Sequence, residues 1–123
     1  MKNLIIDAAN DKIVFSIITE KQSYTTAHTN SRENFDKFMK LLLSFLKKNN
    51  TNLDDIKKIF VNQGPGKFSG IRASLATAKA LSFVNKVNLY GFNSNQIIDQ
   101  NYKKIIELFN KGVLIKNLIK PEY

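Results

Sequence analysis

The sequence predicts an α/β domain built on a five-stranded mixed sheet, with its elements in the order β-β-β-α-β-α-β-α. Three strand-like segments come first and are separated only by short turns, which is typical of an antiparallel meander. A strand, a glycine-rich loop and a helix of small residues follow, and another apolar strand comes after them. This order gives a sheet with antiparallel and parallel pairs and helices on its faces. With 123 residues, the chain is expected to form one domain.

The three opening strands are predicted from short runs of β-branched and apolar residues. We expect them at residues 4–6, 13–19 and 23–29. The third segment carries mainly hydroxyl side chains, which do not suit a strand in the middle of a sheet. We therefore expect residues 23–29 to lie at an edge.

The first helix is predicted from about residue 31 to residue 48, because apolar side chains recur there at helical spacing. Asn30 or Ser31 can cap its N-terminus. Leu41 and Leu43 flank the apolar stripe and widen it to an arc of about 200°, which is broader than the stripe of an ordinary surface helix. The flanks of this arc therefore need a covering that a small domain does not obviously provide.

A second strand and helix are predicted at residues 57–62 and 70–85, followed by a fifth strand at residues 87–91. A last short helix carries apolar side chains between Tyr102 and Phe109. Gly112 is expected to end it, since glycine is common just after a helix C-terminus.

The composition is basic, with a net charge of +9 and a pI near 9.8. One interpretation is attraction to nucleic acid. The other is the codon bias of an A/T-rich genome, which we prefer because lysine dominates and the arginines are Arg32 and Arg72, whereas specific phosphate and base recognition favours arginine.

The absence of cysteine excludes a disulfide framework and a thiolate metal site. No apolar run approaches the roughly 20 residues of a membrane span, and the first residues do not resemble a signal peptide. We therefore expect a cytoplasmic protein without a membrane partner.

The most informative motif is the run from Gly64 to Arg72, with the sequence GPGKFSGIR. It follows an apolar strand and opens into a helix, so backbone N–H groups and a helix N-terminus converge at one point, as an anion site requires. The run is either a phosphate loop or a sharply shaped docking loop, and its spacing does not match the Walker A pattern. We expect at least one of Gly64, Gly66 and Gly70 to have a positive φ.

This run resembles the signature GPGSFTG[IVL]R of the TsaB (YeaZ) family, which is a glycoprotease-like branch of the actin/Hsp70 superfamily. It differs from the signature at Lys67 and Ser69. Asp7 is similar to the aspartate of the family's first strand, although Ala8 replaces the threonine that follows it. Arg32 and the segments 106–112 and 119–123 also resemble parts of the family pattern.

The resemblance implies a ribonuclease-H-like lobe. Typical members carry a second lobe after the fifth strand, and the present sequence has no room for one. We therefore expect one glycoprotease-like domain over residues 1–123, with the second lobe absent. A phosphate at the glycine-rich loop would then lack an opposite wall.

Candidate phosphate contacts are few, and each has a structural alternative. They are Asp7, Gly64, Gly66, Lys67, Ser69 and Gly70. Asp7 could hold a metal-bound phosphate, but we prefer the alternative in which its side chain caps a turn. His28 is the single histidine and has no cysteine or second histidine with which to build a metal site or a catalytic triad. We therefore expect no catalytic residue, metal or cofactor.

The two main helices are a candidate partner interface. Small residues in the helix at 70–85 allow close packing either on its own sheet or on a partner helix, and the wide arc at 31–48 favours the partner. Arg72 could hold the loop or contact a partner carboxylate, and a covering of the arc by the C-terminal tail is the alternative to an interface. The candidate interface residues are Phe35, Phe38, Met39, Leu42, Leu43, Leu46, Ile71, Arg72, Leu75, Ala78 and Lys79.

The resemblance implies a non-catalytic scaffold that supports a TsaD-like catalytic subunit, together with a TsaE-like ATPase. The substrate of that complex is tRNA, which receives threonylcarbamoyl on N6 of adenosine 37. We expect a homodimer through the helices at 31–48 and 70–85 when the partner is absent. The alternatives are a nucleotide-binding fragment of an actin/Hsp70-like ATPase and a small basic RNA-binding module.

Overall fold

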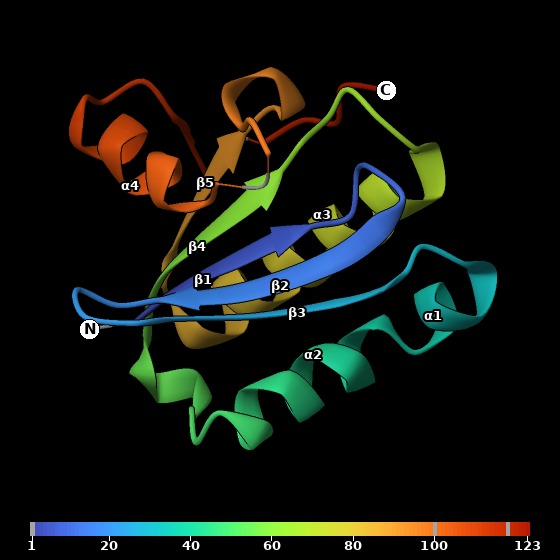
Figure 1. The fold of residues 1–123 in the computed structure, drawn as a ribbon, viewed down its shortest axis with the longest axis horizontal. Helices are drawn as coiled ribbons and strands as arrows, with labels where there is room; N and C mark the ends of the chain where they lie inside the picture. The colour runs from blue at the N-terminus through green and yellow to red at the C-terminus, as the bar shows by residue number, and fades with distance from the viewer. Residues whose placement is uncertain (1, 100, 118) are drawn as a thin grey trace.

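A six-stranded mixed sheet lies at the centre of the computed structural model, which describes residues 2–99, 101–117 and 119–123 (Figure 1). The strand order is β3-β2-β1-β4-β5-β6. β1, β2 and β3 form the antiparallel meander, β4 and β5 add in parallel, and β6 pairs antiparallel to β5. The strands are β1 Lys2–Asp7, β2 Lys12–Ile18, β3 Ser23–Thr29, β4 Ile56–Asn62, β5 Asn88–Phe92 and β6 Ile115–Lys116.

The position of β3 confirms the expectation that residues 23–29 form an edge strand. Most of its side chains are exposed, whereas those of β1 and β2 are largely buried. The meander therefore places its most polar strand where only one side needs a partner strand.

The prediction of five strands is wrong by one, because β6 adds a short sixth strand among the described residues. Ile115 pairs with Gly91 and Lys116 pairs with Tyr90. Both β6 residues are exposed, so no alternation of buried and exposed side chains distinguishes the strand in the sequence.

The helix predicted at residues 31–48 is divided into two helices at Lys37, whose backbone leaves the helical region with φ −119° and ψ 29°. Ser31 caps the first of them, since its side chain accepts a hydrogen bond from the Asn34 N–H. The next long helix begins at Phe68, two residues earlier than expected. The helices are α1 Arg32–Asp36, α2 Phe38–Lys48, α3 Phe68–Asn85 and α4 Lys103–Asn110, with single 3₁₀ turns at η1 Leu53–Asp55 and η2 Ser94–Gln96.

The sheet has a hydrophobic core on each face. One face packs against α1, α2 and α3 through residues such as Phe15, Leu42 and Ile71. The other face packs against α4, where Phe60 of β4 meets Tyr102 and Ile105. Figure 1 shows α3 running behind the sheet and α4 near the end of β4. Among the described residues, no helix is both long and apolar enough to cross a membrane.

Candidate functional site

The carboxyl ends of β1 and β4 meet at one place, because the two strands are parallel neighbours. Asp7 ends β1 and Asn62 ends β4, so their side chains lie together. In open α/β sheets this edge is where ligands usually bind. Ser94 and Tyr102 complete a polar group that we call the Asp7 cluster: Asp7, Asn62, Ser94 and Tyr102.

Both carboxylate oxygens of Asp7 accept hydrogen bonds inside the chain. The Tyr102 hydroxyl donates to Oδ2 at 2.7 Å, and Asn62 Nδ2 donates to Oδ1 at 3.0 Å. The Ala9 N–H also donates to Oδ1 at 3.3 Å, which is the turn-capping role preferred for Asp7. Asp7 is only 5% exposed. The carboxylate is therefore buried and already hydrogen-bonded by groups of its own chain.

Tyr102 is held as a hydrogen-bond donor by its surroundings. Burial, followed by the charge of Asp7 and the hydrogen bond to it, raises the pKa of Tyr102 well above its usual range. The hydroxyl therefore stays protonated at neutral pH and keeps donating to Asp7.

Asn62 connects the Asp7 cluster to the glycine-rich loop. Its Oδ1 accepts a hydrogen bond from the Gly64 N–H at 2.8 Å, while Ser94 Oγ donates to the Pro65 carbonyl at 2.7 Å. The Ser94 N–H donates to the Gly64 carbonyl at 2.9 Å. The start of the loop is therefore held by protein groups on both sides.

Gly64 confirms the prediction that one loop glycine has a positive φ, with a value of +110°. A Cβ added there would lie 1.9 Å from the backbone oxygen of Glu122. The C-terminal segment packs at this point, since the Glu122 N–H donates to the Gln63 carbonyl at 2.6 Å and Gln63 Nε2 donates to Glu122 Oε1 at 2.8 Å. The shape of the loop thus accommodates the tail of the same chain.

Gly66 and Gly70 pack against the turn between β1 and β2. A Cβ on Gly66 would lie 2.2 Å from the Ala9 carbonyl oxygen, and one on Gly70 would lie 1.9 Å from that of Ala8. The Lys67 N–H also donates to the Ala9 carbonyl at 2.8 Å. The two glycines therefore allow the loop to pack closely on this turn of its own chain.

Among the other motif residues, Ile71 is buried and three polar side chains are exposed. Lys67 Nζ lies 2.9 Å from Asp11 Oδ1, and this contact lowers the pKa of Asp11. Ser69 is exposed. The Arg72 guanidinium stacks over the Phe68 ring at 5.2 Å and has no described contact with a carboxylate, so neither alternative offered for it is decided.

The structure separates the candidate interface residues into three groups. Phe35 and Met39 are partly buried, while Leu43, Arg72 and Lys79 are exposed. The others face the sheet of their own chain, so they belong to its core and are not free to contact a partner: Phe38, Leu42, Leu46, Ile71, Leu75 and Ala78.

Sequence reasoning missed two features of the surface and the site. Phe83 and Val84 of α3 are 86% and 71% exposed, whereas the sequence pattern predicts only a helix of small residues. Asn62 and Tyr102 both donate hydrogen bonds to Asp7, and the sequence patterns at residues 57–62 and around Tyr102 predict only a strand and a helix. The polar pair Asn62–Gln63 directly after an apolar strand is the signal that could have indicated the first of these contacts.

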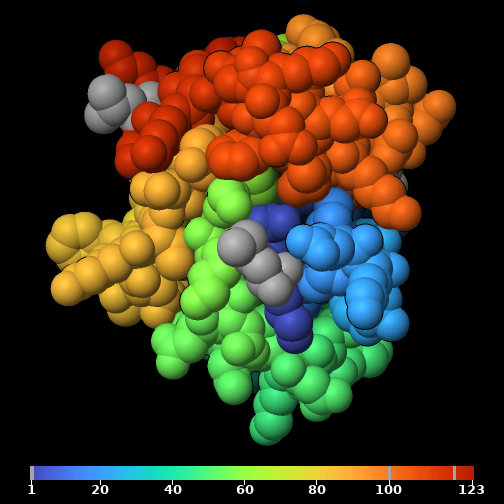
Figure 2. Space-filling model, turned by 90° about the vertical axis from the view of Figure 1, so that its left-hand side faces the viewer, coloured from blue at the N-terminus to red at the C-terminus, as the bar shows by residue number. Residues whose placement is uncertain are grey.

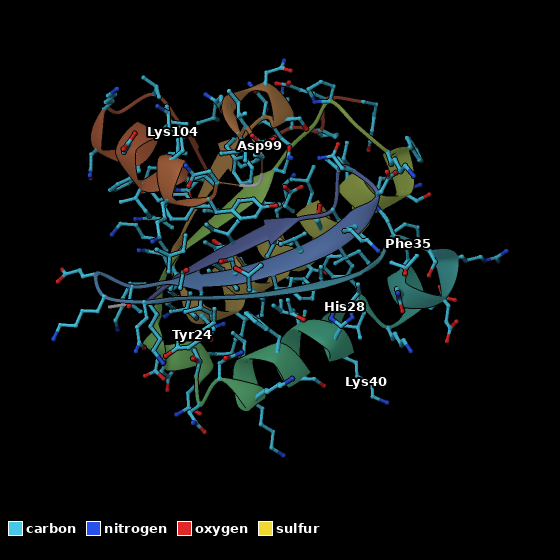
Figure 3. The ribbon with its side chains drawn as sticks, in the orientation of Figure 1. Tyr24, His28, Phe35, Lys40, Asp99 and Lys104 are labelled. Atoms are coloured by element: carbon cyan, nitrogen blue, oxygen red, sulfur yellow. The ribbon has the colours of Figure 1, made fainter. Side chains whose placement is uncertain are left out.

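His28 lies on the edge strand β3. Within the part of the chain that the structure describes, no three His, Asp or Glu side chains gather where they could hold a metal ion. The His28 ring instead lies 6.1 Å from that of Phe15, on the side of β3 that faces α2 (Figure 3).

Comparison with known proteins gives the family. The model of the family TsaD: tRNA N6-adenosine threonylcarbamoyltransferase matches residues 5–104, which is most of the chain. Two proteins named tRNA threonylcarbamoyladenosine biosynthesis protein TsaB are also similar. That of Buchnera aphidicola subsp. Schizaphis graminum (strain Sg) is 29% identical over 105 residues, or 82% of this chain and 50% of the relative. The chain belongs to the TsaB (YeaZ) group of this family.

The second TsaB relative, from Buchnera aphidicola subsp. Baizongia pistaciae (strain Bp), is 33% identical over 69 residues, or 49% of this chain and 31% of that protein. Among solved structures, YeaZ from Pseudomonas aeruginosa superposes with a TM-score of 0.73 at 16% identity, covering 90% of this chain and 50% of that one. This likeness confirms the ribonuclease-H-like α/β fold expected for a TsaB chain. The chain spans at most about half the length of these relatives.

Proposed function

We propose that this TsaB-type chain is a non-catalytic accessory subunit in the synthesis of N6-threonylcarbamoyladenosine at adenosine 37 of tRNA. In this proposal it supports a TsaD-like catalytic subunit, and a TsaE-like ATPase acts with the pair. In the absence of TsaD, the same helices of two copies form a homodimer.

The proposal that the chain is not itself catalytic is supported by the closed state of the Asp7 cluster. Asp7 lies at the position where a superfamily ATPase would hold a metal-bound phosphate, and both of its carboxylate oxygens accept hydrogen bonds from this chain. Tyr102, Asn62 and Ala9 are the donors. The glycine-rich loop is likewise occupied by the turn at Ala8 and Ala9 and by the tail.

The observation that carries the proposal is a set of exposed apolar side chains on α2 and α3, which we call the helix surface. Its large members are Leu43, Phe83 and Val84, which are 42%, 86% and 71% exposed. Ala76 and Ala80 are exposed on the same helix as Phe83 and let a partner helix approach closely. In Figure 2 the C-terminal end of α3, in gold, projects from the left-hand side of the molecule.

The two helices adjoin beside Leu43. Leu43 and Leu46 of α2 line one hollow together with Asn85, the last residue of α3. A standard interface buries about 800 Å² on each partner, which two exposed helix sides can supply. Large exposed apolar side chains often mark such interaction sites.

The test is sedimentation of the chain with and without the TsaD protein of its own source. Phe83→Asp and Leu43→Asp are expected to weaken association by at least about tenfold, because each places a charge in an apolar contact. Ile98→Asp is the matched control, since Ile98 is 74% exposed between η2 and α4, away from α2 and α3. The proposed role would be contradicted if the chain does not bind TsaD, or if Ile98→Asp weakens the association as much as the other two substitutions.

A further inference from the structure

β3 presents a free backbone edge. The Thr19 N–H donates to the Gln22 carbonyl, and the Asn30 N–H donates to the Asp11 carbonyl, so hydrogen-bonded pairs alternate along the β2–β3 ladder between these two points. Residues Tyr24, Thr26 and His28 therefore exchange their backbone bonds with β2. Ser23, Thr25 and Ala27 direct their N–H and C=O groups away from the sheet.

The edge lacks the devices that usually protect an edge strand. β3 pairs with β2 in an unbroken register over its seven residues, without a bulge. Its sequence, SYTTAHT, contains no proline, lysine or acidic residue. Natural edge strands are commonly shortened, bulged or charged to prevent the addition of another strand. β3 is therefore open to such an addition.

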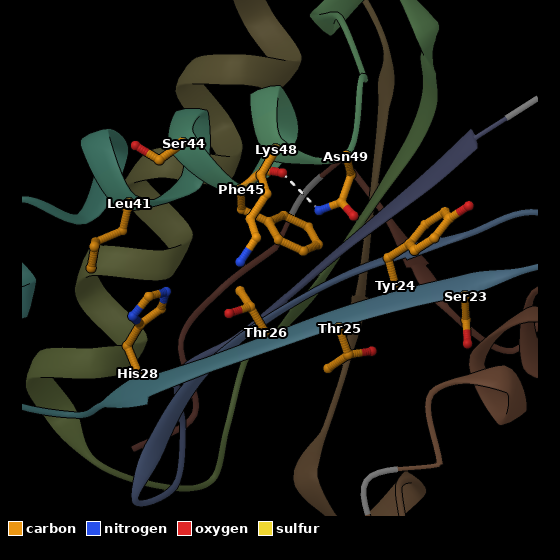
Figure 4. A pocket seen from close by; sticks show the side chains of 10 residues that line it. All are labelled: Ser23, Tyr24, Thr25, Thr26, His28, Leu41, Ser44, Phe45, Lys48 and Asn49. Carbon is orange, nitrogen blue, oxygen red and sulfur yellow. Dashed lines mark hydrogen bonds between the residues drawn. The ribbon is translucent and has the colours of Figure 1, made fainter.

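A groove follows the same strand. It lies between β3 and α2, has a volume of about 460 Å³ and extends from Ser23 and Asn49 at one end to His28 and Leu41 at the other (Figure 4). Tyr24 and His28 lie on the α2 side of β3, one near each end of the strand (Figure 3). Phe45 forms part of the apolar wall, and its carbonyl accepts from Asn49 Nδ2 at 2.8 Å.

The charge of the groove is positive. Lys48 lines it, and none of its ten lining residues is acidic. None of the salt bridges between described residues involves Lys48. The chain as a whole carries a net charge of +9, which opposes the approach of a second copy and favours an acidic partner.

We propose that β3 and this groove bind an extended acidic segment of a partner protein, which adds to the sheet as a further strand. The backbone of this segment forms hydrogen bonds with that of Ser23, Thr25 and Ala27. Every second side chain of the segment enters the groove, where a carboxylate pairs with the Lys48 ammonium. This mode combines affinity from main-chain hydrogen bonds with selectivity from side-chain pockets. The surface differs from the helix surface, so the proposal stands independently of the TsaD role.

The test is selection from a displayed library of randomised peptides of about nine residues, long enough to span one strand. The selected peptides should alternate β-branched residues with Asp or Glu. When a selected peptide binds, amide hydrogen exchange should slow at Ser23, Thr25 and Ala27, while the amides of Tyr24 and Thr26, already bonded to β2, change little. The proposal would be overturned if exchange slows at the Tyr24 and Thr26 amides instead, or if the selected peptides contain no acidic residues.

Ala27→Pro provides the decisive variant. Proline removes an outward N–H and no bond to β2, and edge strands tolerate it. It should reduce peptide binding by at least about tenfold through loss of backbone pairing, while the exchange pattern of β2 shows that the sheet is intact. Unchanged binding to this variant would contradict strand addition.

Lys48→Glu tests the charge, with Lys47→Glu as its control, because Lys47 is exposed on the same helix and does not line the groove. Only Lys48→Glu should weaken binding of the acidic peptides, by several-fold or more. Equal effects of the two variants would assign the attraction to overall charge. A homodimer that Ala27→Pro dissociates would show that a second copy occupies the edge, and would also overturn the proposal.

Discussion

The Tyr102 hydroxyl donates to a buried carboxylate, so its removal should be measurable in stability. Tyr102→Phe is expected to lower the free energy of unfolding by about 1.5–3 kcal/mol, the range for hydrogen bonds to charged groups. Urea denaturation at neutral pH measures this difference. Tyr24→Phe is the control, since the ring of Tyr24 is exposed at the sheet edge and its change should stay within about 0.5 kcal/mol.

The same residue predicts a pH dependence. The pKa of Tyr102 is raised in the folded chain, first by burial and then by Asp7, so the folded state retains a proton that the unfolded state loses above about pH 10. The stability that Tyr102 contributes is fully present below that pH and falls as the pH rises further. Unfolding followed between pH 8 and 11 should show a shallower decline for Tyr102→Phe than for the unsubstituted chain.

Two glycines with positive φ allow backbone strain to be separated from steric exclusion. Gly64→Ala introduces both effects, because its φ is positive and the new Cβ would also clash with the Glu122 backbone. Gly112→Ala introduces only backbone strain, since nothing lies within 4 Å of its Cβ position. We expect Gly112→Ala to cost about 1 kcal/mol and Gly64→Ala clearly more, as measured by thermal unfolding. Equal losses would mean that the tail does not constrain the loop.

At the scale of elements, α3 ends in a backbone conformation that lowers stability and that a substitution can relieve. Lys86 follows the helix with φ 54° and ψ 43°, a left-handed conformation that glycine adopts more easily. Lys86→Gly is expected to raise the free energy of unfolding by about 0.5–1 kcal/mol. Lys111→Gly, at the end of α4, is the control, because Lys111 has right-handed angles and should gain nothing.

The strands and most helices could be predicted because their signals are local. The meander, β4, β5 and the edge position of β3 all follow from side-chain patterns within a few residues. The break at Lys37 could not, since residues on both sides of it continue the helical apolar spacing and the break depends on how α1 and α2 fit the sheet. β6 could not be predicted either. Its pairing with β5 depends on how the chain after α4 runs back beside the sheet, and its own two residues carry no strand pattern.

At the scale of the whole molecule, both cores share one sheet, so we expect a single cooperative unfolding transition. Leu42→Ala on one face and Ile105→Ala on the other should each lower stability by about 2–5 kcal/mol. Because these residues belong to separate clusters, their effects should add within about 0.5 kcal/mol in the double variant. Two separate transitions by circular dichroism and tyrosine fluorescence would show that the faces unfold independently.

The site could be predicted only in part, because some of its contacts join residues that are far apart in the sequence. The glycine-rich motif and Asp7 stand out in the sequence because glycine spacing and a strand-end carboxylate are visible there. The bond from Tyr102 to Asp7 joins residues at opposite ends of the chain, and it exists because α4 packs beside the carboxyl end of β1. No local pattern carries that information, and neither does the exposure of Phe83 and Val84, which depends on which face of α3 meets the sheet.

The central position of β1 has a consequence for the speed of folding. Its antiparallel partner β2 follows it directly, so the meander can form from local contacts within about 1–10 μs, as hairpins do. Its parallel partner β4 arrives only after β3, α1 and α2, since Leu4 pairs with Ile59. Closing that long intervening segment costs entropy before any pairing rewards it. We therefore expect the joining of β4 to β1 to limit the folding rate.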